Sequence, residues 1–274
     1  MTLVVAQVLD GRITVVADTK ITFTHDVTRT RQVYVNALPK IVIVRRDLCV
    51  AYAGNDPEGV LEALTANRGL TIEGMVELAI GMPHADFLLA SLEGLPSLIA
   101  VHEGKPEDRT TIGRAWAGNR AAYDRFRKKE TEYGDRLEDW LLFWESVREV
   151  TESGDVDDVG GYVTVVWTEP EGFSFLAGTT VTALKRTPVW VTDAEGKPQL
   201  SMETAEDADP WSTEVAGVPG TSDTFGALAC FMNPPGLALL FPHDAPGDAI
   251  KFRATSIEDV IEQAAREHGQ QLRG

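Results

Sequence analysis

The chain has 274 residues with 42 acidic and 25 basic side chains, a formal net charge of −17, and 43% of its residues are hydrophobic. A chain of this length buries roughly three-quarters of its extended surface, so it can build a large core. The negative charge argues against a nucleic-acid-binding protein, which needs a basic surface, and against binding to anionic membranes. No apolar run approaches the roughly 20 residues of a membrane span.

The first residues and the cysteines predict a cytoplasmic protein. The opening segment has no basic region and reaches Asp10 too early for a signal peptide. Cys49 and Cys230 form no paired motif, as is usual in a reducing compartment. The five histidines lack metal-ligand spacing, and the chain contains no P-loop, dinucleotide or GxSxG motif. We therefore expect neither a metal nor a cofactor.

The first expected element is a β-hairpin with strands at 3–9 and 12–17. Asp10-Gly11 between them is typical of a type I′ turn, because both central residues of that turn need positive φ. A two-residue turn brings Thr2 close to Asp18 at the open end of the hairpin. The start of the chain is thereby tied into a sheet, whereas termini more often fray.

The remaining elements predict an α+β protein, because strands and helices come in separate runs rather than as alternating βαβ units. Further strands are expected at 40–44, 48–54, 86–92, 97–102, 111–117, 162–168, 173–179 and 236–241. Helices are expected at 57–66, 71–80 and 257–268, with one or two more within 119–150. Residues 184–223 are rich in Pro, Thr, Asp and Glu, and we expect an extended insertion there.

Thr2 is the residue whose position points to chemistry. Methionine aminopeptidase removes Met1 when the second residue is small, and removal would give Thr2 a free α-amine. This amine has an ordinary pKa of about 8 and can accept the proton of the adjacent hydroxyl, directly or through water. A nearby ammonium would lower the pKa of the amine, and a carboxylate would hold that ammonium in place.

Two segments resemble a known family. TLVVAQVLDGRITVVADTKIT, residues 2–22, looks like the opening hairpin of proteasome β-subunits and the bacterial HslV peptidase, which are N-terminal nucleophile hydrolases. KIVIVRRDLCVAYAGNDPEGVLEAL, residues 40–64, is similar to that family's block of a lysine, two short strands, alanine-glycine and a helix. By this resemblance Thr2 is the nucleophile, Lys40 tunes its amine and Asp18 holds Lys40. Gly54 would supply a backbone N–H to the oxyanion, a contribution of a few kcal/mol.

The resemblance also implies an architecture and partners. It implies a four-layer αββα sandwich over residues 1–183, with residues 184–274 as an extension made of the extended insertion, a strand and a C-terminal helix packed on the core. It further implies a homo-oligomeric ring that acts on peptide or protein substrates. Whether an ATPase partner feeds such a ring is left open.

The sequence departs from the family pattern in two places near the start of the chain and the middle helices. The loop between Asp18 and Lys40 is several residues longer than usual. Asn119 stands where the family has its helper serine, and Arg120 stands where a glycine is usual. Asn119 is therefore the candidate for the helper position.

A third departure lies in residues 155–161, which resemble the family's Asp-x-x-Ser-Gly-Gly segment. Val159 takes the place of the serine, and either Asp155 or Asp157 supplies the aspartate. Two alternatives to a peptidase therefore stay open. One is a catalytically inactive ring subunit that acts as a scaffold or gate, and the other is a small-molecule amidase on the same fold.

Overall fold

The computed structural model describes residues 2–19, 32–34, 38–134, 138–153, 156, 159–182, 186–192, 198–204, 211–233 and 236–274. Within these ranges the chain forms three five-stranded antiparallel sheets, a smaller three-stranded sheet and five helices. The expected combination of helices with antiparallel strands is confirmed. Asp155 and Asp157 lie outside the described residues.

Sheet I contains the expected opening hairpin. Leu9 pairs with Arg12, and Asp10 and Gly11 between them have φ of 50° and 74°, as a type I′ turn requires. In spatial order its strands are β11 (Gly172–Phe175), β10 (Val163–Glu169), β2 (Arg12–Asp18), β1 (Leu3–Leu9) and β9 (Arg114–Gly118). The opening hairpin therefore occupies the middle of the sheet, with a partner strand on each side.

Sheet II is built from the segments that follow Lys40. Its strands in spatial order are β4 (Ile41–Arg45), β5 (Leu48–Gly54), β6 (Ala85–Ser91), β7 (Ser97–His102) and β8 (Lys105–Asp108). Helices α1 (Pro57–Ala66) and α2 (Ile72–Ile80) pack on one face of this sheet, where Leu61 and Met75 share a buried cluster with Tyr52 and Phe87. The side chains of Asp56 and Thr71 cap the two helices.

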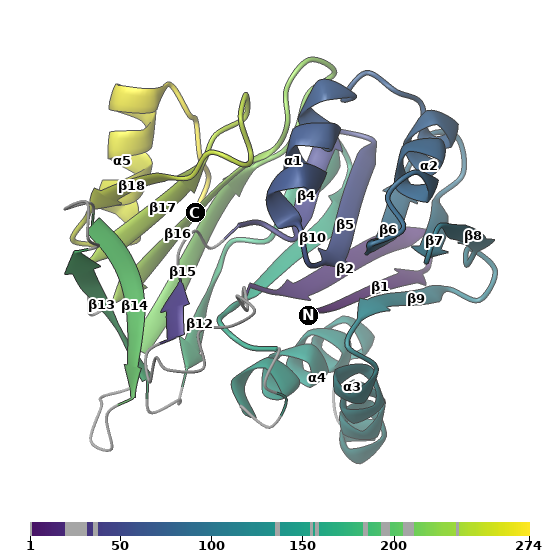
Figure 1. The fold of residues 1–274 in the computed structure, drawn as a ribbon, viewed down its shortest axis with the longest axis horizontal. Helices are drawn as coiled ribbons and strands as arrows, with labels where there is room; N and C mark the ends of the chain where they lie inside the picture. Colours follow the sequence, from purple (N-terminus) through teal and green to yellow (C-terminus); the bar gives the residue numbers. More distant parts are fainter. Residues whose placement is uncertain are drawn as a thin grey trace.

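The other face of sheet II packs against sheet I. Alternation along β1 divides its side chains between two cores: Val4 and Ala6 lie in the cluster between the sheets, while Leu3 and Val5 face α3 (Arg120–Tyr133) and α4 (Asp139–Ser153). In Figure 1 the chain start lies at the end of β1, between α1 and α2 above and α3 and α4 below. Helices thus lie on the outer sides of both sheets.

The apolar side of α4 is only partly buried. Phe143 and Val147 are fully packed against sheet I, but Trp140 is 51% exposed. Trp140 lies in the first turn of the helix, and its indole N–H donates to Glu138 at 2.9 Å. The spacing of apolar residues predicts which side of a helix is apolar. It does not predict how much of that side other elements cover, and the first turn of α4 is left exposed at Trp140.

Regular strands occupy much of the segment expected to be extended and irregular. β13 (Arg186–Thr192) and β14 (Pro198–Thr204) form a small sheet with β3 (Gln32–Tyr34). Sheet III follows in the order β12 (Gly178–Thr182), β15 (Trp211–Val218), β16 (Ala227–Asn233), β17 (Leu237–Phe241) and β18 (Ile250–Arg253). The pattern is hard to recognise in the sequence because β12 and β15, which pair directly, are far apart in the chain.

Sheet III joins the other two sheets through a shared core. Leu239 and Cys230 belong to the same buried cluster as Phe175 of sheet I and Ile43 of sheet II. Its other face is covered by α5 (Ile257–His268), whose N-terminus is capped by the Ser256 side chain. The C-terminal segment also pairs with β15, since Arg273 and Gly217 exchange two backbone hydrogen bonds.

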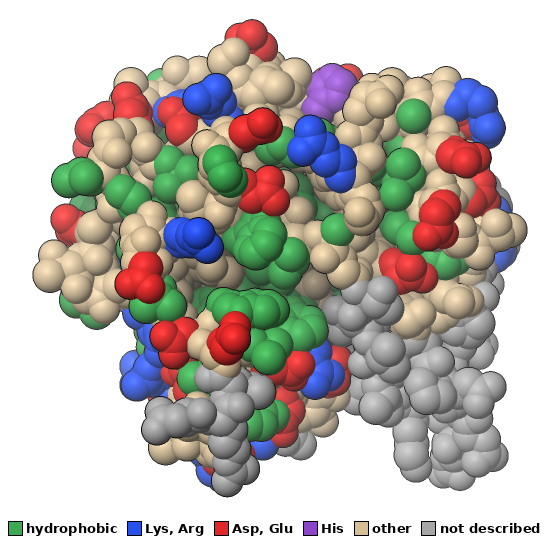
Figure 2. All heavy atoms as spheres, turned by 180° about the vertical axis from the view of Figure 1, so that it is seen from behind, with side chains coloured by type: hydrophobic (Ala, Val, Ile, Leu, Met, Phe, Trp, Pro, Cys, Tyr) green, Lys and Arg blue, Asp and Glu red, His purple; other side chains and the backbone are tan. Residues whose placement is uncertain are grey.

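Acidic and basic side chains are interspersed on the face shown in Figure 2, with a group of hydrophobic side chains near its centre. This face therefore shows no field of a single sign, despite the net charge of −17. In the described part of the chain, no helix combines the length and apolar character needed to cross a membrane.

Replacing Leu239 by alanine tests whether sheet III unfolds together with sheets I and II. Leu239 is 1% exposed within the shared core, so Leu239→Ala should lower the free energy of unfolding by about 2–5 kcal/mol while urea unfolding keeps one transition. Leu95→Ala, at a side chain that is 86% exposed, is the control and should change it by less than about 0.5 kcal/mol. A second transition in urea, monitored by tryptophan fluorescence and circular dichroism, would contradict a common core.

Candidate functional site

Three of the predicted site residues meet at one end of the space between sheets I and II. Thr2 precedes β1, Asp18 ends β2 and Lys40 precedes β4, and their exposed fractions are 2%, 0% and 6%. The Lys40 ammonium donates to the Thr2 hydroxyl, and that hydroxyl donates to an oxygen of Asp18. Lys40 Nζ also lies 3.3 Å from both Asp18 oxygens. The predicted nucleophile, cation and carboxylate are therefore in direct contact.

Asp18 is held in place by backbone groups as well as by Lys40. The N–H of Leu3 donates to one carboxylate oxygen at 2.8 Å, and the N–H of Gly160 donates to the other at 3.1 Å. A fully buried carboxylate is stable only when such donors and a cation replace water. The carboxylate thus joins the start of β1, the end of β2 and the segment before β10.

The backbone of Thr2 is held from the opposite side by β9. The N–H of Asn119 donates to the Thr2 carbonyl at 2.7 Å. This close approach requires a glycine at position 118, where φ is +98° and an added Cβ would lie 2.0 Å from the Thr2 oxygen. Thr2 is therefore fixed both by its side chain and by its carbonyl.

The structure brings Asn119 to the site by its backbone rather than by its side chain. The Asn119 side-chain oxygen accepts the N–H of Ala122 at 3.0 Å and thereby caps α3. A serine hydroxyl in this place could transfer a proton, but an amide engaged in a helix cap cannot do the same chemistry. Asn119 therefore lies next to Thr2, but it contacts Thr2 through its backbone N–H and not through a side-chain hydroxyl.

Gly54 and Val159 lie near the Thr2, Asp18 and Lys40 cluster without belonging to its hydrogen-bond network. Gly54 ends β5 opposite Ala85, and its neighbour Ala53 lies against Gly118, but the Gly54 N–H makes none of the bonds that join Thr2, Asp18 and Lys40. The side chain of Val159 is 1% exposed in the apolar cluster beneath α3 and α4. The family's serine position therefore contributes to the core.

The buried thiols are poor competitors for the role of nucleophile. Burial raises the pKa of the Cys230 thiol to about 12, and burial raises the pKa of Cys49 further still. Both thiols therefore stay protonated near neutral pH, and the thiolate is the reactive form of cysteine. Thr2 with its adjacent ammonium remains the activated nucleophile candidate.

Among the described residues no group of His, Cys, Asp and Glu could hold a metal ion.

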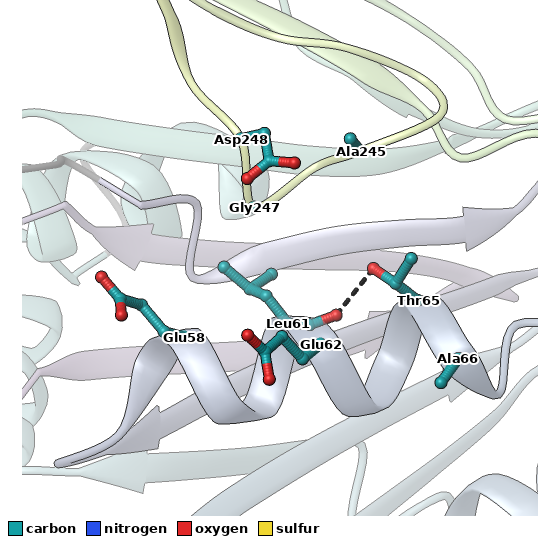
Figure 3. Close-up of a pocket in the computed structure, with 8 residues that line it drawn as sticks. All are labelled: Glu58, Leu61, Glu62, Thr65, Ala66, Ala245, Gly247 and Asp248. Atoms are coloured by element: carbon teal, nitrogen blue, oxygen red, sulfur yellow. Dashed lines mark hydrogen bonds between the residues drawn. The ribbon is translucent and has the colours of Figure 1, made fainter.

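A separate groove with a volume of about 540 Å³ lies between α1 and the 245–248 loop. Figure 3 shows Glu58, Leu61 and Glu62 on the helix below the loop that carries Asp248. The groove contains none of the residues predicted for the site. Its lining offers carboxylates and the Thr65 hydroxyl, which donates to the Leu61 carbonyl, but no cation to activate that hydroxyl.

The comparisons with known proteins find similarity only to solved structures, and it is weak for the one described here. The sequence matches no protein-family model and none of the curated proteins. The crystal structure of eukaryotic HslV from Trypanosoma brucei is similar with 14% sequence identity and a TM-score of 0.44, over 61% of this chain and 98% of that chain. A TM-score this low does not indicate a function, so any function must be inferred from the geometry of the site.

Sequence reasoning did not single out two glycines that hold the site together. Gly118 lets β9 approach Thr2, and Gly160 offers its N–H to Asp18. A glycine directly before a capping residue, as in Gly118-Asn119, was the available signal, but it is also common at ordinary helix starts.

Adding one methyl group at Gly118 should disturb the site through the Thr2 carbonyl. Gly269, with φ of +67° and open space around it, provides the control, because Gly269→Ala should cost only the about 1–2 kcal/mol of a left-handed residue. Gly118→Ala also places a side chain at positive φ, and in addition its Cβ overlaps the Thr2 carbonyl oxygen. It should therefore lower the free energy of unfolding by more than Gly269→Ala does. Equal losses in urea denaturation would show that β9 does not press on Thr2.

Proposed function

We propose that this chain is a threonine-type N-terminal nucleophile hydrolase of amide bonds, in which Thr2 becomes the first residue after Met1 is removed. The observation that carries the proposal is the convergence of the Thr2 hydroxyl, the Lys40 ammonium and the Asp18 carboxylate in a buried place. Thr2 directly precedes β1, Asp18 ends β2 and Lys40 directly precedes β4, so three separate segments bring these side chains together. A threonine hydroxyl is a weak nucleophile by itself, and activation needs an adjacent base or a neighbouring charged group of this kind.

The reaction begins with transfer of the Thr2 hydroxyl proton to the free α-amine, directly or through one water. The oxygen then forms a bond to the carbonyl carbon of the substrate amide, and the Lys40 ammonium stabilises the negative charge on the attacking oxygen. As the carbon–nitrogen bond breaks, the α-ammonium returns the proton to the leaving amine. Water then attacks the ester on Thr2 with the amine as base, releasing the acid and restoring the hydroxyl.

Asp18 contributes by fixing the cation and the nucleophile. The N–H groups of Leu3 and Gly160 fix the carboxylate, and its contact with Lys40 holds the ammonium against Thr2. The Gly54 N–H is the proposed donor to the oxyanion, as the family resemblance implies. Asn119 is proposed to act through its backbone, and Asp155 or Asp157 remains the proposed aspartate of the segment that precedes Gly160.

The layers of the fold support a proteasome-like architecture. Helices on the outer faces of two packed antiparallel sheets are what a four-layer αββα sandwich requires, with residues 1–183 as its core and 184–274 as an extension. We propose a cytoplasmic homo-oligomeric ring that cleaves peptides or proteins, with a small-molecule amide as the alternative substrate. Profiling with peptide and simple amide substrates separates these two.

Removal of the Thr2 hydroxyl is the primary test of the proposed reaction. Thr2→Ala should lower hydrolysis of fluorogenic peptide amides by more than about 1,000-fold, because no other nucleophile stands in its place. Thr2→Ser keeps a hydroxyl next to the amine and should retain measurable turnover. Unchanged hydrolysis by Thr2→Ala would refute the mechanism.

Lys40 should support both activity and stability. Lys40→Met removes the charge beside the nucleophile, which we expect to reduce kcat/KM by about 10²–10⁴-fold. It also breaks the buried ion pair with Asp18, which costs about 3–5 kcal/mol in the free energy of unfolding. Lys105→Met, at an exposed residue of β8, is the control and should change neither quantity. A Lys40→Met protein with wild-type kinetics would rule out a role for the ammonium.

An inactive ring subunit is the second candidate, and two observations favour it. Val159 is buried in the core, and the Asn119 side chain caps a helix, so neither supplies the hydroxyl found in the family. Intact mass and N-terminal sequencing distinguish the candidates. A chain that begins at Thr2 agrees with the enzyme, whereas a retained Met1 blocks the amine and favours a scaffold or gate.

A further inference from the structure

Asp86 lies beside the candidate site but has no role in the reaction proposed for Thr2, Lys40 and Asp18. It is the second residue of β6, opposite Ala53 of β5, and Ala53 is the residue that lies against Gly118. Alternation along β6 directs Asp86 to the same side as Leu88 and Ala90, whose side chains fill the space between sheets I and II. Its carboxylate is therefore at the same end of this space as Thr2, with its side chain 28% exposed.

Three groups from other strands converge on this carboxylate. His102 Nδ1 at the end of β7 lies 3.5 Å from an Asp86 oxygen, and the N–H of Glu103 donates to that oxygen at 3.4 Å. The third group is the backbone N–H of Gly118, which faces this carboxylate and contributes to lowering its pKa. Partial burial opposes ionisation, but these donors and the charge of His102 outweigh it and lower the pKa of Asp86 below its ordinary value.

The direction of the Gly118 N–H follows from the pairing of β9. Asn119 donates to Thr2, and Gly113 accepts from Val8, so these alternate residues turn their backbone groups toward β1. The residues of the other parity, Arg114, Trp116 and Gly118, turn their N–H and carbonyl groups to the opposite edge of the strand. β9 is the outer strand of sheet I, so this edge has no neighbouring strand within the sheet. Asp86 supplies from sheet II the acceptor that Gly118 lacks within sheet I.

The contacts form a continuous connection from sheet II to the nucleophile. The Asp86 carboxylate faces the N–H of Gly118. The next peptide group carries the N–H of Asn119, which donates to the carbonyl of Thr2. Gly118 has no side chain of its own to fix its unusual φ of +98°. A loss of the Asp86 carboxylate would release one side of the residue on which the position of Thr2 depends.

We propose that Asp86, supported by His102, is a positioning residue for the reaction, one that acts on Thr2 through the Gly118–Asn119 backbone. This inference rests on the proposed function of Thr2 and adds a residue to it. Asp86 neither touches Thr2 nor exchanges protons with it. Its effect is to keep the nucleophile at the distance and angle that attack requires, since small misplacements of reacting groups cost large factors in rate.

The test compares three full-length variants with the wild type, using a blocked peptidyl coumarylamide that the wild type cleaves. Asp86→Ala removes the acceptor, Asp86→Asn keeps an oxygen that can accept from Gly118, and Asp124→Asn removes a carboxylate from the exposed pair with Arg120 on neighbouring α3. We expect Asp86→Ala to lower kcat at least 10-fold with KM changed less than 3-fold, Asp86→Asn to recover most of kcat, and Asp124→Asn to match the wild type. Hydrogen exchange should show faster exchange of the Asn119 amide in Asp86→Ala alone.

Each contrary outcome is informative. Wild-type kcat or unchanged Asn119 exchange in Asp86→Ala overturns the inference while leaving the proposed function intact. Equal loss of kcat in Asp86→Ala and Asp86→Asn, together with lowered unfolding midpoints in both, shows a purely structural role and also overturns it. A mature wild-type protein that cleaves no amide substrate contradicts the proposed function itself, and the inference is rejected with it.

Discussion

The buried carboxylate of Asp18 is the constraint on which the rest of the site depends. A fully buried charge is tolerated only where donors and an opposite charge replace its water, and here every such group comes from a different part of the chain. Satisfying Asp18 fixes Leu3, and with it the direction in which the chain enters β1. It also fixes Lys40 and the segment before β10. The electrostatic requirement of one side chain thus determines where the nucleophile lies.

The position of Thr2 is determined by backbone contacts as much as by charges. The hairpin places Thr2 beside Asp18, but the hydrogen bond from Asn119 and the close approach of Gly118 set the position of its carbonyl. Rigid placement by strands rather than loops suits a reaction whose rate depends on geometry. The same arrangement explains how Asn119 can stand in the helper position: its backbone contacts Thr2 while its side chain caps α3.

Much of the site could be predicted because its signals are local in the sequence. The Asp10-Gly11 turn fixes the register of a short hairpin, and the register alone brings Thr2 to Asp18. The meeting with Lys40 is not local, and it could be anticipated only because the surrounding pattern resembles a known family. Gly118 could not be predicted because its importance arises from the pairing of β9 with the distant β1. Asp86 could not be predicted because its neighbours come from strands of two sheets. Of sheet III, the strand at 236–241 is expected and present as β17, but its sheet could not be assembled from the sequence because β12 pairs with the distant β15.

The most direct test of the central claim is covalent labelling of the mature protein with an electrophile that traps threonine nucleophiles, such as a peptide epoxyketone or a β-lactone. The account predicts one adduct per chain, mapped by peptide mass spectrometry to Thr2, and no adduct in the Lys40→Met protein. Mature protein that begins at Thr2 and is labelled at another residue, or at none, would contradict the claim that Thr2 is an activated nucleophile.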